Sequence, residues 1–541
     1  MRSTADGPSG TVAGRWGGRA WLTPVNVAIV ATTAIALALR LYQLSGPGYL
    51  LGVTEYDDGS YFGSAIHLVN GVLPYRDFVF VQPPGITLLM TPIALLAKGI
   101  GTANGMAVAR VLTTLASAGG VLLAGLLVRH RGTAATIIAG GILAVYPDSI
   151  STARTVLLEP WLALFCLAGA VAMFNRDRIT DSRRRLILGG ILFGFAGSIE
   201  AWAIAPALVV LALTLPRVRH LLTGVAGMAI GFLIPVVPFA ALDPSSFFRD
   251  LVVAQAGPRK GAIYVPVWYR FKEMTGLSDI QVSHALEAGL VLLIIVVVAA
   301  GLAAPWMRDR RPPPALDWFP AATAGLIAAA FMLPDVFYFH FVAFLAPFIA
   351  LAVGLALSRL LDAARPVMDR GGVGPALRWW AGGLAAVVIL VFGYSEASAI
   401  YRDQHGRLAL DAAARVDIVQ YAKRVIPPGT CVLTDQVSYT IAADRFVTSV
   451  PGCSTMDDGT GADLALSHGL KPSTGANKVP AVVNMWRDAF EHAQYVLLSG
   501  GNIKRVAWNA SLQAYFNDNF RLIYMVRSGD KLYVRNGVHP R

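Results

Sequence analysis

Residues 221–242 read LLTGVAGMAIGFLIPVVPFAAL and contain no charged side chain. A transmembrane helix needs about 20 consecutive, mostly apolar residues to cross the hydrocarbon core of a bilayer. This run is therefore predicted to span a membrane, and ten further apolar runs lie before and after it. They cover approximately 22–44, 106–128, 133–147, 156–174, 186–200, 202–215, 284–304, 316–334, 338–360 and 379–397. The pattern predicts a polytopic α-helical membrane protein with about 11 transmembrane helices, within a range of about 10–13.

The composition agrees with a membrane protein. Of the 541 residues, 55% are hydrophobic and 14% are charged, whereas a soluble domain carries about 25% charged residues. This excludes a wholly soluble globular enzyme and a disordered chain. The net charge of +12 comes largely from basic bursts between apolar runs, such as Arg129 and Arg131, 183–185 and 308–311. Such bursts are typical of cytoplasmic loops, so we expect the lipid bilayer, and no nucleic acid, as their partner.

The basic loops also predict the topology. Residues 1–21 are rich in Gly and Arg and are interpreted as a disordered cytoplasmic tail. Residues 82–99, QPPGITLLMTPIALLAKG, are apolar but contain three prolines and two glycines. Counting them as a span would move most basic loops outside, so we predict a re-entrant or interfacial helix there. The transmembrane module then covers 22–398, with external loops at 45–105 and 243–283.

Residues 399–541 differ in composition and are predicted to form a small soluble α/β domain outside the membrane. Helix-like stretches (408–425, 482–492 and 507–518) alternate there with strand-like ones (430–434, 494–498, 520–526 and 531–535). An extracytoplasmic location allows a disulfide between Cys431 and Cys453. The spacing of the two cysteines does not decide whether that bond forms.

Three carboxylates follow the first predicted span, in the sequence EYDDG at 55–59. A solvated turn is one interpretation, because Asp-Gly is common in turns. The amphipathic helix predicted at 61–69 would lie in the membrane interface, which favours a functional site instead. There a carboxylate pair would meet lipid head groups, and burial would raise its pKa toward the range of a general base. Asp57 and Asp58 also allow a divalent cation. Neither lies in an apolar run, so we expect the fold to tolerate their substitution.

Residues 57–89, DDGSYFGSAIHLVNGVLPYRDFVFVQPPGITLL, resemble the first external loop of polyprenyl-phosphate-sugar glycosyltransferases with the GT-C fold. The likeness is strongest to the branch of protein O-mannosyltransferases and aminoarabinose lipid A transferases. Asp57 and Asp58 match the acidic pair of this family, and Tyr61 and Arg76 match further positions of its motif. The resemblance implies a GT-C-like transmembrane bundle.

Shorter matches extend the resemblance along most of the chain. They are Arg154 and Glu159 within 147–160, Tyr338 and His340 within 338–341, and the C-terminal segments 426–435 and 532–535, which resemble a small domain of actinobacterial members. Glu200 departs from the pattern, because related chains often carry Lys or a polar residue there. Its role is left open.

The resemblance implies an enzyme that moves a sugar from a polyprenyl-monophosphate donor to a hydroxyl of a cell-envelope glycan, lipid or protein. The reaction would take place at the external face of the bacterial plasma membrane. Asp57 and Asp58 would be the catalytic residues, with Asp57 as the general base. The reaction would invert the anomeric carbon and require no cofactor. The usage of Ala, Gly and Arg is typical of a GC-rich actinobacterium, for which the sugar would be a hexose or pentose such as mannose or arabinose.

The leaving phosphate of such a reaction needs cations. Arg259 and Lys260, with Tyr264, are the predicted phosphate-binding residues of the loop 243–283. An equally simple interpretation of these basic residues is attraction to anionic lipid. The other predicted substrate-binding residues are His340, Tyr338, Arg154, Glu159, Tyr61 and Arg76.

A carrier of different class, a flippase for polyprenyl-linked sugars, is the alternative function. A carrier would be expected to place charges at mid-membrane depth and to show internal repeats. The apolar runs are nearly free of central charges, and no repeat is evident in the sequence. The sequence therefore favours the enzyme.

Overall fold

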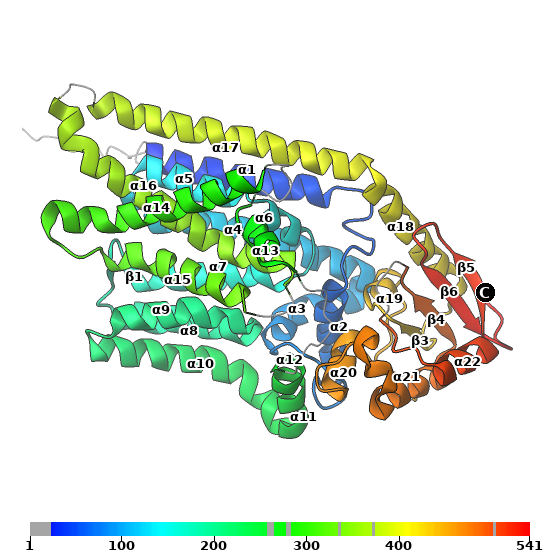
Figure 1. The fold of residues 1–541 in the computed structure, drawn as a ribbon. Coiled ribbons are helices and arrows are strands. Elements are labelled where there is room, and N and C mark those ends of the chain that lie inside the picture. Colours follow the sequence, from blue (N-terminus) through cyan, green and yellow to red (C-terminus); the bar gives the residue numbers. More distant parts are fainter. Residues whose placement is uncertain (1–22, 257–264, 277–282, 334–336, 371–373, 501–504) are drawn as a thin grey trace, which may run out of the picture.

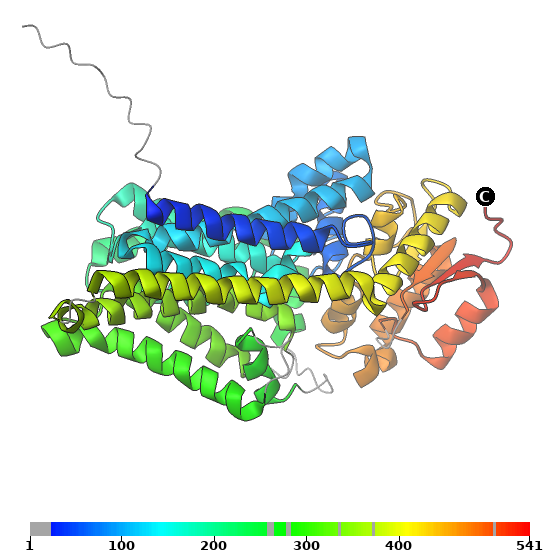
Figure 2. The ribbon, with the colours of Figure 1, turned by 90° about the horizontal axis from the view of Figure 1, so that it is seen from above.

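The computed structural model describes residues 23–256, 265–276, 283–333, 337–370, 374–500 and 505–541. Long helices run roughly side by side in one elongated bundle, and the C-terminal residues lie at one end of it (Figures 1 and 2). α17 runs along the length of the bundle and continues into the C-terminal part (Figure 1).

Each of the eleven predicted apolar runs overlaps a helix. The helices are α1 (Pro24–Leu44), α4 (Thr102–Val128), α5 (Thr133–Ala144), α7 (Leu158–Met173), α8 (Arg183–Ile199), α9 (Ile204–Thr214), α10 (Val218–Leu242), α14 (His284–Asp309), α15 (Ala315–Phe331), α16 (Val342–Arg370) and α17 (Gly374–His405). The local sequence explains where they begin. For example, α1 starts at Pro24, and the side chain of Thr23 caps it by accepting a hydrogen bond from the Asn26 amide.

Six helices of the described residues are long and apolar enough to cross a membrane. A bent pair, 133–144 followed by 147–154 at 61°, raises this number to seven. α7, α8, α9 and α15 have 16, 17, 11 and 17 residues. At about 1.5 Å per residue they are shorter than a hydrocarbon core of about 30 Å. The chain is thus a multi-pass membrane protein, and the number of eleven crossings stays a prediction.

Close helix packing in the bundle depends on small residues. α8 and α10 approach through Gly194 and Gly231, where a Cβ atom would overlap the backbone of Met228 and of Ile191 respectively. Small residues at such contacts are typical of membrane helices, because they allow the backbones to approach.

Short elements connect the helices of the bundle. They are η1 (Arg129–Arg131), α6 (Pro147–Ser151), η2 (Thr152–Arg154), β1 (Phe174–Asn175), β2 (Arg178–Ile179), η3 (Ala201–Ala203), α11 (Pro244–Phe248), the π-helix η4 (Arg249–Val253), α12 (Ala254–Ala256), α13 (Val267–Met274) and η5 (Phe339–Phe341).

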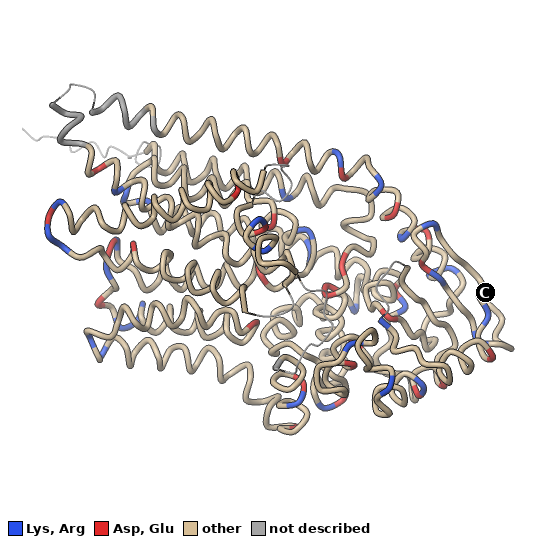
Figure 3. Tube along the Cα trace, viewed as in Figure 1, with Lys and Arg blue, Asp and Glu red and all other residues tan. Residues whose placement is uncertain are grey.

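The end of the bundle remote from the C-terminal part carries the basic loops (Figure 3). Arg131 lies 2.7 Å from carboxylate oxygens of both Asp177 and Asp317, and Arg359 lies 2.8 Å from Asp317. These ion pairs join η1, the β1–β2 hairpin, α15 and α16 at one end. The loops that the sequence analysis placed on one side of the membrane therefore lie together.

α2 (Asp57–Val69) and α3 (Gly85–Ile100) lie between the bundle and the C-terminal part (Figure 1). The prediction of a lipid-facing helix at 61–69 is wrong, because every residue of 58–67 is buried in protein. At Gly59 and Gly63 a Cβ would overlap Ser438 and Asp457, so these glycines let the C-terminal part pack directly on α2. α3 has 16 residues, contains Pro92 and is shorter than a span, in agreement with a non-spanning helix.

The C-terminal part contains a four-stranded sheet in the order β3-β4-β6-β5. β3 (Val432–Thr434) and β4 (Tyr495–Leu498) are parallel, whereas β6 (Lys531–Arg535) pairs antiparallel with β4 and with β5 (Phe520–Met525). The accompanying helices are α18 (Arg407–Val425), α19 (Ser438–Ala442), α20 (Gly459–Leu466), α21 (Pro480–His492) and α22 (Ala510–Asn519), with the 3-10 turns η6 (Pro472–Thr474) and η7 (Ala476–Lys478). The predicted strands and helices of this part each overlap an observed one.

A disulfide joins Cys431 to Cys453, and the remaining cysteine, Cys166, is free and buried in the bundle. We expect denatured, unreduced protein to take up one alkyl group, on Cys166, and reduced protein to take up three. Mass spectrometry of the intact chain measures this directly. Three alkyl groups without a reductant would contradict the bond.

Candidate active site

The predicted acidic pair starts α2, where carboxylates are favoured by the positive end of the helix dipole. Successive helical residues point about 100° apart, so the two side chains face different surroundings. Asp58 is fully buried, whereas Asp57 is partly exposed. The structure therefore separates two residues that the sequence analysis treated as one pair.

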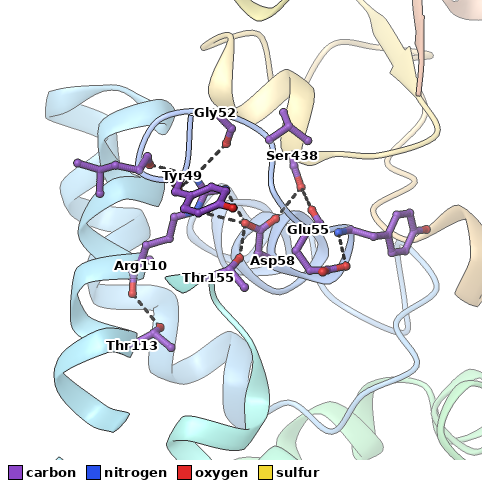
Figure 4. A network of polar contacts seen from close by, with 12 residues as sticks. Tyr49, Gly52, Glu55, Asp58, Arg110, Thr113, Thr155 and Ser438 are labelled. Carbon is purple, nitrogen blue, oxygen red and sulfur yellow. Dashed lines mark hydrogen bonds and ion pairs between the residues drawn. The ribbon is translucent and has the colours of Figure 1, made fainter. Parts of the chain in front are cut away.

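Asp58 is the centre of a buried hydrogen-bond network (Figure 4). It accepts from Arg110 at 2.5 Å, from the Thr155 hydroxyl at 2.6 Å and from the Ser438 hydroxyl at 2.7 Å. Arg110 also donates to the carbonyl oxygens of Tyr49, Leu50 and Gly52, each at 2.9 Å. The network ties together the loop before α2, two bundle segments and the C-terminal part.

This network corrects two predictions about Asp58. The side chain has no exposed surface and both of its oxygens accept hydrogen bonds, so it has no free face for a substrate. Its position outside the apolar runs also does not make it dispensable for folding, because its removal would leave the buried Arg110 charge unpaired. Asp58 is a structural anchor for the loop that carries Asp57.

The occupied oxygens of Asp58 also bear on the predicted divalent cation. A cation between Asp57 and Asp58 would compete with Arg110 and Thr155 at Oδ2 of Asp58, and with Ser438 at Oδ1. Across the part of the chain that the structure describes, no group of three His, Cys, Asp or Glu residues is arranged to hold a metal. A cation at this pair stays a prediction that fits the geometry poorly.

Asp57 has a pKa near neutral pH. Burial raises its pKa to about 7, and the negative charges of Glu55, Asp458 and Glu159 act in the same direction. The positive charge of His340 acts against them. A carboxylate with a pKa near 7 is about half ionised at neutral pH, and its ionised form is basic enough to accept a proton in a transition state.

Two other predicted residues, from the bundle, act electrostatically on Asp57. Nδ1 of His340, in η5, lies 2.7 Å from Oε1 of Glu159, at the start of α7. Glu159 is 2% exposed, and its second oxygen has no hydrogen-bond partner among the described residues. Both residues were predicted from the sequence, but their pairing was not, because they are 181 positions apart.

Tyr61 and Glu200 complete the bundle side of the site. Tyr61 follows Asp57 by one helical turn, and burial raises its pKa, as do the charges of Asp57, Glu200 and Glu159. Glu200 lies where α8 ends and η3 begins, and its Oε2 is buried without a partner in the described chain. The sequence analysis gave Glu200 no role, and the structure places it in the same cluster of charges.

The remaining predicted residues lie around or away from this cluster. The ring of Tyr338 stacks on His340 with centroids 5.4 Å apart. Arg154 lies over the ring of Tyr49, 4.7 Å from its centroid, beside the loop before α2. Arg76 is exposed and pairs with its neighbour Asp77 at 2.8 Å, and no described contact joins it to Asp57. Arg259, Lys260 and Tyr264 lie outside the described residues.

The C-terminal part adds residues that the sequence analysis missed. The hydroxyl of Tyr56 donates to Oδ1 of Asp458 at 2.7 Å, although the two residues are 402 positions apart. The guanidinium of Arg505 lies 4.6 Å from the centroid of the Tyr56 ring. No sequence pattern predicts these contacts, because the residues are far apart in the chain and the local sequence around one carries no information about the other.

If Asp57 must be ionised to act, we expect kcat/KM to rise with pH through about 7 and then to level off. Glu55→Gln removes a negative charge that raises the pKa of Asp57, so its profile should shift to lower pH. Asp57→Asn should remove the inflection. A profile that falls as pH rises through 7, or an Asp57→Asn profile with the inflection intact, would assign the base to another residue.

Known proteins share this architecture. Residues 80–334 match the model of Glycosyltransferase family 87. The structure is similar to ArnT from Cupriavidus metallidurans bound to undecaprenyl phosphate, with a TM-score of 0.61 and 15% identity, over 93% of this chain and 97% of that one. It is also similar to the Archaeoglobus fulgidus oligosaccharyltransferase in complex with Zn and sulfate, with a TM-score of 0.50 and 14% identity, over 94% and 73%. No curated protein sequence matches the chain.

These similarities confirm the resemblance to GT-C-fold glycosyltransferases that residues 57–89 predicted. The fold similarity covers nearly the whole chain, including the C-terminal part. Together with the family match over 80–334, it supports a membrane glycosyltransferase.

Proposed function

Because the chain has this fold and matches glycosyltransferase family 87 over 80–334, we propose that it transfers a sugar from a polyprenyl-monophosphate donor to a hydroxyl acceptor. The acceptor is a cell-envelope glycan, lipid or protein. The proposal depends on one observation: the carboxylate of Asp57 is partly exposed and its pKa is raised to about 7. It lies among side chains from the bundle and from the C-terminal part.

In this reaction Asp57 takes the proton of the acceptor hydroxyl. The acceptor oxygen forms a bond to the anomeric carbon while the bond from that carbon to the phosphate oxygen breaks. The electron pair of the broken bond leaves on the polyprenyl phosphate, and a single displacement of this kind inverts the anomeric configuration. The proton passes from Asp57 to solvent, which restores the base.

The departing phosphate gains negative charge, and nearby cations stabilise it. His340 is one such cation when protonated, because Glu159 pairs with its Nδ1 and leaves Nε2 for another partner. Arg259 and Lys260 stay the predicted phosphate ligands of the loop 243–283. The proposed reaction requires no cofactor.

The proposed donor is a hexose or pentose, such as mannose or arabinose, on a polyprenyl phosphate. The test is to incubate the purified protein in lipid nanodiscs with radiolabelled polyprenyl-phosphate sugars and cell-wall acceptors. The expected product carries the label on the acceptor with an inverted anomeric configuration, measured by NMR. A protein that moves the donor across a vesicle membrane without forming such a product would be a carrier, and the proposal would fail.

We also propose the orientation of the chain in the plasma membrane, with residues 1–21 cytoplasmic and 399–541 outside. Arg185 and Arg402 lie near opposite ends of the bundle, in the first turn of α8 and the last turn of α17. A topology reporter fused after Arg185 should therefore be cytoplasmic, and one fused after Arg402 external. Reporters on the same side, or on the reversed sides, would contradict this orientation.

A further inference from the structure

Arg505 brings a positive charge from the C-terminal part to the residue next to the base. Its guanidinium carbon lies 4.6 Å from the centroid of the Tyr56 ring. Tyr56 directly precedes Asp57 in the chain. The fold therefore places this arginine against the residue that precedes Asp57, even though Arg505 and Tyr56 are far apart in the sequence.

The Tyr56 ring is a fixed support for this arginine. Its hydroxyl donates to Oδ1 of Asp458 at 2.7 Å and accepts from the amide of Thr460 at 3.1 Å. Both partners lie at the start of α20, where Asp458 is the N-cap. The ring thus keeps one orientation, and a guanidinium over its face gains a cation–π interaction.

Arg505 is also held from its other side. Its Nη1 donates to the hydroxyl of Ser499 at 2.7 Å. Ser499 is itself fixed by Asp435, which accepts from its amide at 2.8 Å and from its hydroxyl at 2.6 Å. The guanidinium is therefore preorganised before any substrate arrives.

The described residues use only a small part of the hydrogen-bonding capacity of Arg505. Within the described part of the chain it forms no ion pair within 4.0 Å, and its one hydrogen bond there is the one from Nη1 to Ser499. The side chain is only half-buried. A guanidinium whose Nε and Nη2 donate to none of the described residues presents the planar fork that binds two oxygens of a phosphate or carboxylate.

Carboxylates outnumber cations among the charged groups that act on Asp57, so an anionic substrate would need a further cation there. The principal groups that act on Asp57 are three carboxylates, Glu55, Asp458 and Glu159, and one cation, His340. A phosphate entering this surrounding would be repelled by the carboxylates unless further positive charge faced it. Arg505 is the described arginine that lies against the neighbour of Asp57.

We propose that Arg505 binds an anionic oxygen of the substrate beside Asp57. The ligand is either the phosphate of the lipid donor or an anionic group of the acceptor, since both offer the same oxyanion chemistry. The inference rests on the proposed function for the reaction, but binding of the oxyanion can be measured without it. The C-terminal part would then supply a substrate ligand in addition to supporting the loop before α2.

The test compares Arg505→Ala and Arg505→Lys in the full-length protein in nanodiscs. We expect Arg505→Ala to weaken binding of polyprenyl monophosphate about 10- to 100-fold, and binding of phosphate-free polyprenol to stay unchanged. Arg505→Lys should be intermediate, because an ammonium keeps the charge but lacks the fork. The matched control is Arg487→Ala. Arg487 lies 3.6 Å from the Tyr515 ring centroid and pairs with Glu491, away from Asp57, so affinity should not change.

The outcomes separate the two sources of the oxyanion. Weaker binding of polyprenyl monophosphate assigns Arg505 to the donor. Unchanged donor binding with about a 10-fold weaker binding of an anionic acceptor, but not of a neutral one, assigns it to the acceptor. No change in either, relative to Arg487→Ala, overturns the inference. If Arg505→Ala lowers the melting temperature, the binding test is repeated with Arg505→Met. This variant keeps an aliphatic side chain over Tyr56, and its binding results are interpreted in the same way.

Failure of the proposed function gives a different result. A wild-type protein that binds polyprenyl monophosphate through Arg505 but transfers no sugar to any acceptor would contradict the glycosyltransferase. The oxyanion site would remain.

Discussion

Asp57→Asn is expected to lower the turnover of sugar transfer by about 10²- to 10⁴-fold, the usual contribution of a general base. The amide keeps the size of the side chain but cannot accept the proton of the acceptor. Asp57 is partly exposed and forms no described ion pair, so the fold should survive. Donor binding should stay near the wild-type value, because the substitution removes a proton acceptor rather than a phosphate ligand.

The measurement is turnover alongside donor affinity and melting temperature. Glu55→Gln is the matched control, because it removes a neighbouring carboxylate that, among the described residues, accepts a hydrogen bond from the adjacent Tyr56 amide alone. We expect it to change the pH profile more than the maximal rate. Near-wild-type turnover of Asp57→Asn would show that the base lies elsewhere, with Glu159 and Glu200 as the next carboxylates to substitute.

The sequence predicted those parts of the fold that depend on local composition. Apolar runs such as 221–242 became helices because a long apolar segment has few other ways to satisfy its backbone in a membrane. The helices and strands after 399 could also be predicted from the sequence, because buried positions recur with a different period in helices and in strands. The acidic loop was found because charged residues next to a predicted span are conspicuous.

Other features could not be predicted because the same local pattern fits two surroundings. The amphipathic pattern at 61–69 suits a helix in the membrane interface, but it also suits α2, which is buried between the bundle and the C-terminal part. Likewise, adjacent carboxylates look equivalent in a sequence. Only the partners of Asp58, which come from 52, 97 and 380 positions away, distinguish it from Asp57.

Substitutions in the Asp58–Arg110 pair are expected to destabilise the fold. Removing one partner of a buried ion pair costs about 3–5 kcal/mol, because the other charge stays buried without compensation. Arg110→Met should cost more than Asp58→Asn. It leaves the Asp58 carboxylate unpaired and also removes the donor of three loop carbonyls. The measurement is the free energy of unfolding in mixed micelles, with apparent melting temperature as a second readout.

The double variant Asp58→Asn/Arg110→Met separates the ion pair from the rest of the network. The double variant leaves no unpaired charge. Its loss of unfolding free energy should therefore be smaller than the sum of the losses of the two single variants, by about 1–3 kcal/mol. The matched control is the exposed pair Arg487–Glu491, with 2.7 Å between its atoms, whose loss should cost at most about 0.5 kcal/mol.

If the unfolding free energies lost by the two single variants added up in the double variant, the ion pair between Asp58 and Arg110 would not be what holds the loop before α2. The stability values also determine how activity is interpreted. Asp58→Asn should lose activity in proportion to the loss of folded protein, whereas Asp57→Asn should lose it while remaining folded. If Asp58→Asn stayed as stable as the wild type yet lost turnover, Asp58 would act in the reaction despite its burial, and the assignment of roles within α2 would have to be reversed.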